Sequence, residues 1–322
     1  AFWQTPPPPL EKLIFKKSFC FRNGKYISVT TNRKNSRHPS SSDLLSKYSK
    51  TCKNSEHLQQ AEFEGRWIYV KRDWKWAMSN CIFPENKNTK SLATIDCLDT
   101  FKYIYLIGDS HLRYFYLYLL ELYDILDPKI PNTIRFPHSE WKIIYYWAPF
   151  IGNVTDTILE LQKNYTDVSA LKPDQLLIYI SFAWHDITDN YKSFWPYYNG
   201  LPNFFKAVKT LRNDKHFLNS RIIYVTPPSM NDGRHDFVKY YYNRFPTNFE
   251  IELAAAYTKP DLVKLNIEIF DVLLATHAKN QDCHPCCNHF ICRDIKRNKI
   301  QGKWGIKLAN LIISFICDKS SQ

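Results

Sequence analysis

Short apolar segments alternate with helical patterns from about residue 100 onward, and this alternation strongly limits the possible folds. Four segments are apolar almost throughout, which is typical of strands covered on both faces. They are Tyr103–Ile107, Ile143–Trp147, Leu176–Ser181 and Arg221–Val225. Helical patterns lie near 111–126, 155–163, 202–212, 259–276 and 304–317. The sequence therefore predicts an α/β fold, a three-layer sandwich around a central, mostly parallel sheet with right-handed crossovers.

The composition excludes several classes of protein. Hydrophobic residues make up 44% of the 322 residues and aromatic residues 16%, while glycine occurs only 8 times. A disordered chain has fewer apolar residues than this, and a collagen-like chain has far more glycine. The strongest apolar helical segment, Leu112–Leu126, contains Arg113, Glu121 and Asp124. Because a membrane-spanning helix needs about 18 consecutive apolar residues, no membrane span is expected.

Positive charge is concentrated at the start of the chain. Residues 1–55 contain eleven Lys or Arg residues and two acidic ones, so they carry +9 of the formal net charge of +12. We expect a basic, extended N-terminal arm over 1–55 and one domain over 56–322. Such an arm either meets an acidic glycan or is simply solvated. No nucleic-acid-binding motif accompanies the charge, and no nucleic acid partner is expected.

The cysteines indicate an oxidising compartment. Nine cysteines fall into one group before residue 98 and one after residue 282. This distribution favours disulfides that staple the terminal segments to the domain, with one thiol left over. The first residue is alanine, as after removal of a signal peptide, although a truncated chain would begin the same way. The sequons at Asn153 and Asn164 agree with a secreted glycoprotein.

A serine follows the first predicted strand directly, in the segment Gly108-Asp109-Ser110-His111-Leu112-Arg113. The turn from a strand into a helix holds such a serine at the carboxyl edge of the sheet, where open α/β sheets bind ligands. The helix amino terminus would supply N–H donors for an oxyanion, and Gly108 would allow a tight turn. The alternative is that Asp109 and Ser110 only cap the helix.

The segment Leu106–Arg113 resembles the Gly-Asp-Ser-x-x-Arg block of the PC-esterase branch of SGNH/GDSL-like proteins. More closely, residues 50–317 resemble the carboxyl-terminal domain of the neurexophilin and PC-esterase family. The other matching features, in chain order, are Cys52, Gly65–Trp67, Trp74, Cys81, Cys97, Trp147–Gly152, Ser181–Asp186, Asn288–Cys292, Gly302–Gly305 and Cys317.

This resemblance implies a serine esterase or acyltransferase that acts on O-acyl groups of glycans, acetyl groups above all, without a cofactor. Ser110 would attack the ester carbonyl and His289 would serve as general base. The backbone N–H groups of Ser110 and Gly152 would face the oxyanion, and His185 would line the site. Arg113 would either hold a substrate oxygen or anchor the helix.

The tail departs from the family pattern in one respect. The family places an aspartate three residues before the histidine, where this chain has Cys286 before His289. Asp282 lies nearby at a different spacing. Because the carboxylate orients the histidine and does not attack the substrate, Ser110 and His289 could still act as a dyad. The second hypothesis is a catalytically inactive extracellular protein that uses the same fold for binding or structure.

Two further patterns have competing interpretations. The spacing of Cys283, Cys286, His289 and Cys292 suits a tetrahedral zinc site, but disulfides are the stronger expectation in a secreted chain. We therefore expect no metal. His185-Asp186 is either a catalytic pair or a polar strand end satisfied by the backbone. Tryptophans such as Trp147 and Trp184 could stack on sugar rings or fill the core.

Overall fold

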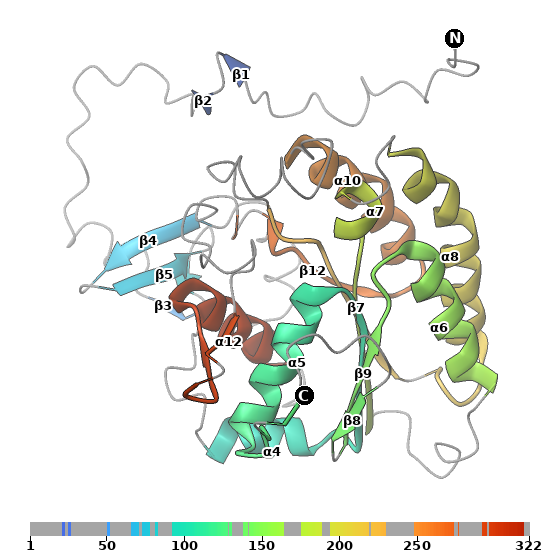
Figure 1. Cartoon of the computed structure of the whole chain (residues 1–322). Coiled ribbons are helices and arrows are strands. Elements are labelled where there is room, and N and C mark those ends of the chain that lie inside the picture. Colours follow the sequence, from blue (N-terminus) through green and yellow to red (C-terminus); the bar gives the residue numbers. More distant parts are fainter. Residues whose placement is uncertain are drawn as a thin grey trace. The chain divides into compact units, whose positions relative to one another are not determined.

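The computed structural model in Figure 1 describes part of the chain. The described residues are 21–22, 25–26, 50–51, 66–70, 73–77, 81–82, 92–127, 129–130, 138–140, 142–163, 175–188, 194–218, 220–229, 248–273, 276, 292–294 and 296–318. The chain divides into two units, Ala1–Ser46 and Lys47–Gln322. In the first unit, β1 (Phe21–Arg22) pairs antiparallel with β2 (Lys25–Tyr26). The features below belong to the second unit.

A six-stranded sheet forms the centre of this unit, in the order β12-β11-β10-β7-β9-β8. Five neighbouring strands are parallel, and only β8 runs antiparallel, against β9. The strands are β7 (Tyr103–Gly108), β8 (His138–Glu140), β9 (Ile143–Trp147), β10 (Leu176–Ser181), β11 (Arg221–Val225) and β12 (Glu268–Phe270). The α/β fold with a mostly parallel sheet is confirmed, and each of the four predicted strands is present.

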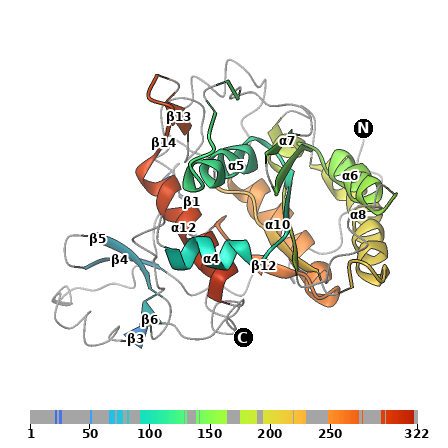
Figure 2. The same cartoon turned by 90° about the horizontal axis from the view of Figure 1, so that it is seen from below.

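Helices cover both faces of this sheet, which is compatible with the predicted three-layer sandwich (Figures 1 and 2). Because strand residues alternate in direction, Leu106 belongs to one hydrophobic cluster and Ile107 to the other. The first cluster contains residues of α4 (Leu92–Asp99), α5 (Ser110–Leu122) and α12 (Lys303–Asp318). The second contains residues of α6 (Ile151–Lys163), α7 (Trp184–Thr188), α8 (Trp195–Asn213) and α10 (Asn248–Lys264).

Four helices differ from the expected ranges: α5 ends at Leu122 and not near 126, α6 begins at Ile151 and not near 155, and the differences in α8 and α10 are larger. α8 and α10 each begin before their expected starts near residues 202 and 259, and each runs through an internal proline, Pro202 or Pro260. The expectation of one helix over 259–276 is wrong beyond residue 264. There Asn266 adopts a left-handed φ of 57°, which is typical of a residue that ends a helix, and β12 follows.

Short strands precede and follow the strands of the central sheet along the chain. Residues of β3, β4, β5 and β6 form a separate four-stranded sheet in the order β3-β6-β5-β4. A hairpin of β13 and β14 precedes α12, and Arg293 in β13 donates hydrogen bonds to the carbonyl oxygens of Asp127 and Ile130, beyond the end of α5. The bounds are β3 (Lys50–Thr51), β4 (Arg66–Val70), β5 (Asp73–Ala77), β6 (Cys81–Ile82), β13 (Cys292–Asp294) and β14 (Lys299–Gln301).

One disulfide joins elements at the two ends of this unit. Cys97 in α4 is bonded to Cys317 in α12, 220 residues later in the sequence. The prediction of disulfide-stapled terminal segments is confirmed for the last helix. The side chains of the other cysteines lie outside the described residues.

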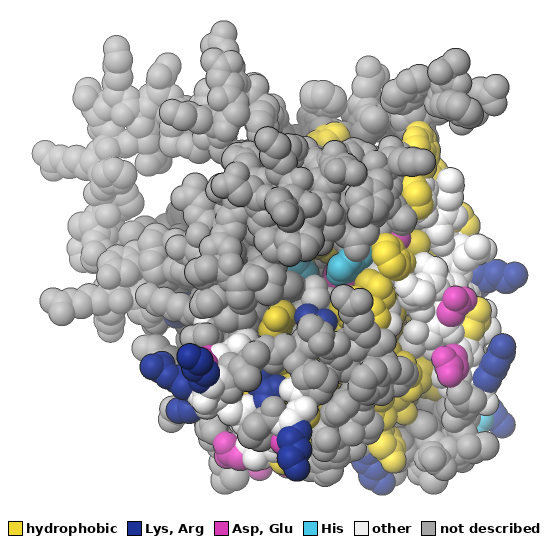
Figure 3. Space-filling view, viewed as in Figure 1, with side chains coloured by type: hydrophobic (Ala, Val, Ile, Leu, Met, Phe, Trp, Pro, Cys, Tyr) yellow, Lys and Arg dark blue, Asp and Glu magenta, His cyan; other side chains and the backbone are white. Residues whose placement is uncertain are grey.

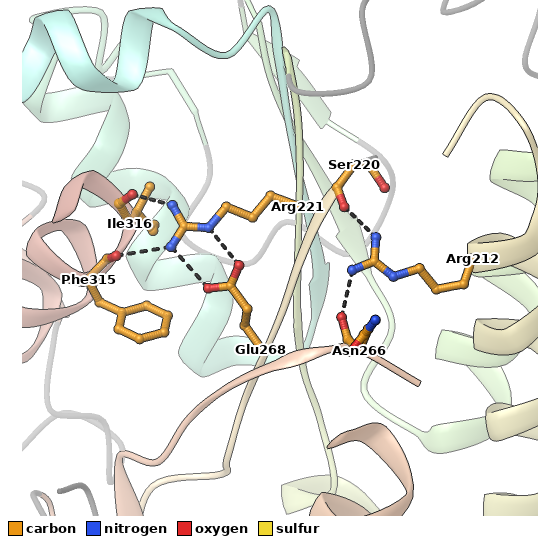
Figure 4. A network of polar contacts seen from close by, with 7 residues as sticks. All are labelled: Arg212, Ser220, Arg221, Asn266, Glu268, Phe315 and Ile316. Atoms are coloured by element: carbon orange, nitrogen blue, oxygen red, sulfur yellow. Dashed lines mark hydrogen bonds and ion pairs between the residues drawn. The ribbon is translucent and has the colours of Figure 1, made fainter. Parts of the chain in front are cut away.

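Two arginine side chains form hydrogen bonds and an ion pair at the amino ends of β11 and β12 (Figure 4). Arg221 binds both carboxylate oxygens of Glu268, at 3.0 and 3.1 Å, and donates to the carbonyl oxygens of Phe315 and Ile316 at the end of α12. Arg212 donates to the carbonyl oxygens of Ser220 and Asn266. These bonds fix α8 and α12 against the sheet.

Arg221→Lys is expected to lower the free energy of unfolding by about 2 kcal/mol. Lysine keeps the charge but cannot reproduce the planar fork that holds Glu268 and two carbonyl oxygens at once. Urea unfolding measures the difference. Arg297 lies on the surface and its closest carboxylate oxygen is 3.8 Å away, on Asp294. Arg297→Lys should therefore change stability by less than about 0.5 kcal/mol, and equal losses in both variants would contradict the role of the Arg221 fork.

Candidate functional site

The turn between β7 and α5 is held by side-chain hydrogen bonds. Asp109 is the N-cap of α5, and its Oδ1 accepts a hydrogen bond from the backbone N–H of His111 at 2.9 Å. The hydroxyl of Tyr145 donates to the carbonyl oxygen of Asp109 at 3.0 Å and also lies 3.3 Å from that of Gly108. The capping interpretation is thus correct for Asp109. Ser110 is the first residue of the helix and not its cap.

Gly108 is required by close approach of the neighbouring strand. A Cβ at this position would lie 2.0 Å from the carbonyl oxygen of Ser181 in β10. The φ angle of Gly108 is not in the left-handed region, so the requirement is space and not the backbone freedom that a tight turn would need. Gly108 and Ser181 are partners in the parallel register. This contact fixes the start of α5 against the end of β10.

Ser110 therefore lies at the carboxyl end of the parallel strands. If the parallel strands β7, β9, β10, β11 and β12 are numbered 1 to 5 along the chain, their order across the sheet from β9 is 2-1-3-4-5. The chain first adds β9 on one side of β7 and then adds β10, β11 and β12 on the other side, so the order reverses at β7. Open sheets of this kind bind ligands at the reversal, here between β7 and β10. Ser110 is 7% exposed and begins a helix of 13 residues. Backbone N–H groups and the positive end of the helix dipole are therefore close to its hydroxyl.

Two histidines lie among aromatic rings beside this turn. The ring of His111 is 5.5 Å from that of Trp184, and the ring of His185 is 5.6 Å from that of Trp147 and 6.0 Å from that of Phe150. Figure 3 shows histidine side chains near the centre of this face, with hydrophobic side chains and a basic side chain beside them. The ends of β7, β9 and β10 contribute these residues to one cluster.

The environment of His111 favours its neutral form. Burial lowers the pKa of His111 to about 4, the neighbouring His185 and Arg113 act in the same direction, and the Asp109 carboxylate opposes them. In the unfolded chain the pKa is the ordinary 6.5. Since the unfolded state binds the proton more tightly, His111 lowers the stability of the fold as the pH falls from about 6.5 towards 4.

This difference leads to a measurable pH dependence. The free energy of unfolding should decrease less from pH 7 to pH 4 in His111→Gln than in the unmodified chain, because glutamine does not titrate. The two decreases should differ by at most about 3 kcal/mol. Urea unfolding at a series of pH values measures the two curves. His216→Gln, at the turn after α8, is the control for the loss of a histidine outside the site. Parallel curves for all three proteins would contradict the assignment.

Asp186 has a structural role in the described geometry. It is 1% exposed, and its Oδ2 accepts a hydrogen bond from the backbone N–H of Ile151, the first residue of α6, at 2.9 Å. A carboxylate at this position satisfies a helix N–H and interacts well with the helix dipole. For Asp186, this contact favours the interpretation as a satisfied polar strand end over that of a catalytic pair with His185.

The other predicted site residues are on or near this edge. Gly152 lies in the first turn of α6, is exposed, and has open space where a Cβ would be. Asn153 is also exposed on α6, so this sequon position is accessible. Arg113 is 7% exposed, and its Cζ lies 5.2 Å from the ring centre of Tyr114 and 5.4 Å from that of Trp147.

A pocket of about 50 Å³ lies beside the turn on the α5 face of the sheet. Its walls come from α5, α12 and the segments at the ends of β10, β11 and β12. They are mostly apolar, and His111, Ser181 and Thr226 supply polar groups. A pocket of this size accepts a few non-hydrogen atoms, as in a short acyl chain.

Several predicted residues fall outside the described part of the chain. They are Asp282, His289, Asn164 and the zinc candidates Cys283 and Cys286. The side chain of Cys292 also lies outside it. Within the described ranges no three potential metal-binding side chains gather at one point, and no helix is long and apolar enough to cross a membrane.

Comparison with known proteins does not identify a family. No protein-family model matches the chain, and no curated protein matches it. The structural features of the site therefore carry the functional argument.

One residue that shapes the site, Tyr145, could not be recognised from the sequence. Tyr145 holds the carbonyl oxygen of Asp109 from a strand 36 residues away. Its segment was recognised as a strand, but strand periodicity does not show which hydroxyl meets which carbonyl. For Trp147 and Trp184, the signal was a position at the end of one predicted strand and three residues beyond the end of another, and both rings lie beside the histidines.

Proposed function

We propose that the chain is a secreted serine esterase or acyltransferase of the SGNH type that acts on an O-acyl group, in the first instance O-acetyl, of a carbohydrate or glycoprotein. The observation that carries this proposal is the position of Ser110. It begins α5 at the carboxyl end of β7, at the point where the strand order reverses. The disulfide between Cys97 and Cys317 supports an extracellular or secretory location.

In the proposed reaction, the Ser110 hydroxyl attacks the ester carbonyl carbon while His289 accepts its proton. The carbonyl oxygen becomes an oxyanion, which the backbone N–H groups of Ser110 and Gly152 stabilise. The alcohol of the glycan then leaves with the proton from His289, and the acyl group remains on Ser110. Water resolves this intermediate in an esterase, and a second glycan hydroxyl resolves it in a transferase.

A second candidate, a catalytically inactive binding protein of the same fold, is favoured by one observation. Ser110 is only 7% exposed, so access of an ester to its hydroxyl is restricted. In addition, Asp282 does not have the spacing of an orienting carboxylate relative to His289. In this case the edge of the sheet binds a glycan without turnover.

Covalent labelling distinguishes the two candidates. The unmodified chain is incubated with a fluorophosphonate and, separately, with an aryl acetate and an acetylated glycan. The esterase or transferase proposal predicts a phosphonylated peptide that contains Ser110 and release or transfer of acetate. Absence of both labelling and turnover across a range of pH, with glycan binding retained, would establish the inactive protein instead.

A further inference from the structure

The hydrogen bonding of Arg113 differs from that of the buried Arg293 and the partly buried Arg221. Arg293 is 6% exposed and donates hydrogen bonds to two carbonyl oxygens and to Asn298. Arg221 binds a carboxylate and two carbonyl oxygens. Arg113 is 7% exposed and so nearly as buried as Arg293, yet no oxygen of a described residue accepts a hydrogen bond from its guanidinium, and its buried Nε has no hydrogen-bond partner among these residues.

Within the described residues, no carboxylate forms an ion pair with Arg113. Asp109 accepts a hydrogen bond from the His111 N–H, and Asp186 accepts one from the Ile151 N–H. The rings of Tyr114 and Trp147 stack on the guanidinium, an interaction that contributes about 0.5–2 kcal/mol. A buried charge without a counterion costs several kcal/mol, so the rings offset only part of this cost.

Arg113 lies next to the proposed nucleophile Ser110. Arg113 is three residues after Ser110, on the same side of the first turns of α5. Its guanidinium extends to Trp147 at the end of β9, and the N-terminus of α5 adds its own positive potential. A planar guanidinium whose N–H groups have no acceptor among the described residues matches a carboxylate or a sulfate.

We infer that Arg113 binds an anionic oxygen group of the substrate, a carboxylate or a sulfate on an acidic glycan, beside the acyl group that Ser110 attacks. This inference rests on the proposed function for the position of the ester. It narrows the substrate class to glycans that carry a negative charge. Arg113 thus orients the substrate and takes no part in bond making or breaking.

Calorimetric titration with three sugars tests the inference on the full chain. Glucuronate presents a carboxylate, glucose 6-sulfate presents a sulfate, and glucose is the neutral control. We expect at least one anionic sugar to bind about tenfold or more tightly than glucose. Arg113→Gln should remove this preference, and Arg113→Lys should retain part of it because the charge remains. Arg297→Gln removes an equal charge from an exposed position and should bind like the unmodified chain.

The outcomes separate this inference from the proposed function. Equal affinity of the unmodified chain for all three sugars would overturn it, and this measurement does not depend on the folding of any variant. An equal loss of anion binding in Arg113→Gln and Arg297→Gln would also overturn it, since the effect would then be general charge attraction. Because binding requires no turnover, Ser110→Ala should bind the anionic sugar unchanged. Anion binding without acyl turnover would contradict the esterase proposal alone.

Discussion

Ser110→Ala is expected to lower the turnover of an acyl ester by a factor of about 10³ to 10⁶. In serine hydrolases the hydroxyl provides the covalent route, and the activity that remains without it comes from the oxyanion site and from binding. The loss should appear in kcat, with KM changed little, because alanine still leaves the helix N-terminus and the substrate contacts in place. Hydrolysis of an aryl acetate and of an acetylated glycan measures it.

The matched control for this experiment is Ser314→Ala. Ser314 lies in α12, and its buried hydroxyl has no hydrogen-bond partner among the described residues, so alanine removes no hydrogen bond there. This variant should keep full activity and stability. If Ser110→Ala retained the activity of the control, another nucleophile would carry the reaction and the proposed role of Ser110 would be wrong.

Gly108→Ala should destabilise the fold by at least about 4 kcal/mol, a large part of the stability of a typical domain. The added Cβ would lie 2.0 Å from the Ser181 carbonyl oxygen, which belongs to the backbone of the adjacent strand. Relief requires β7 and β10 to separate at their carboxyl ends, with loss of sheet hydrogen bonds. Chemical unfolding monitored by circular dichroism measures the change.

Two other glycines provide an internal series for this prediction. At Gly200 a Cβ would meet the Cγ2 of Ile151 at 2.5 Å, and a side chain can move where a strand backbone cannot. Gly200→Ala should therefore cost about 1–3 kcal/mol. At Gly152 no atom lies within 4 Å, and alanine should leave α6 unchanged or stabilise it by up to about 1 kcal/mol. A different ranking of the three would contradict the steric argument.

The strands were predictable because both faces of the sheet are covered. Burial on both sides makes each strand a short apolar run, as in Leu176–Ser181, and such runs stand out from the sequence. The starts of α8 and α10 were not predictable in the same way. Proline is favoured in the first turn of a helix and unfavourable in its interior, yet Pro202 and Pro260 lie inside α8 and α10, where tertiary packing stabilises the helix on both sides of the proline.

The candidate site was predictable only where its parts are local in sequence. The strand, Gly108, Asp109 and the start of α5 follow one another, and the expected serine at the carboxyl edge is present. The contacts of Tyr145 with Asp109 and of Asp186 with Ile151 join residues 36 and 35 positions apart. Such pairs depend on strand register and helix packing, which no local pattern encodes. No local pattern shows either that the Arg113 guanidinium has no acceptor among the residues that the structure describes.

The bond between Cys97 and Cys317 has a consequence for biosynthesis. Its second cysteine follows the first by 220 residues. At a synthesis rate of about 5–20 residues per second, about 10–45 s separate the two cysteines on the ribosome. During that interval every strand of the central sheet is made, while Cys97 either stays reduced or pairs with another cysteine synthesised before Cys317, such as Cys81 or Cys292. Correct maturation therefore calls for an oxidoreductase that can hold or reshuffle this thiol until the last helix arrives.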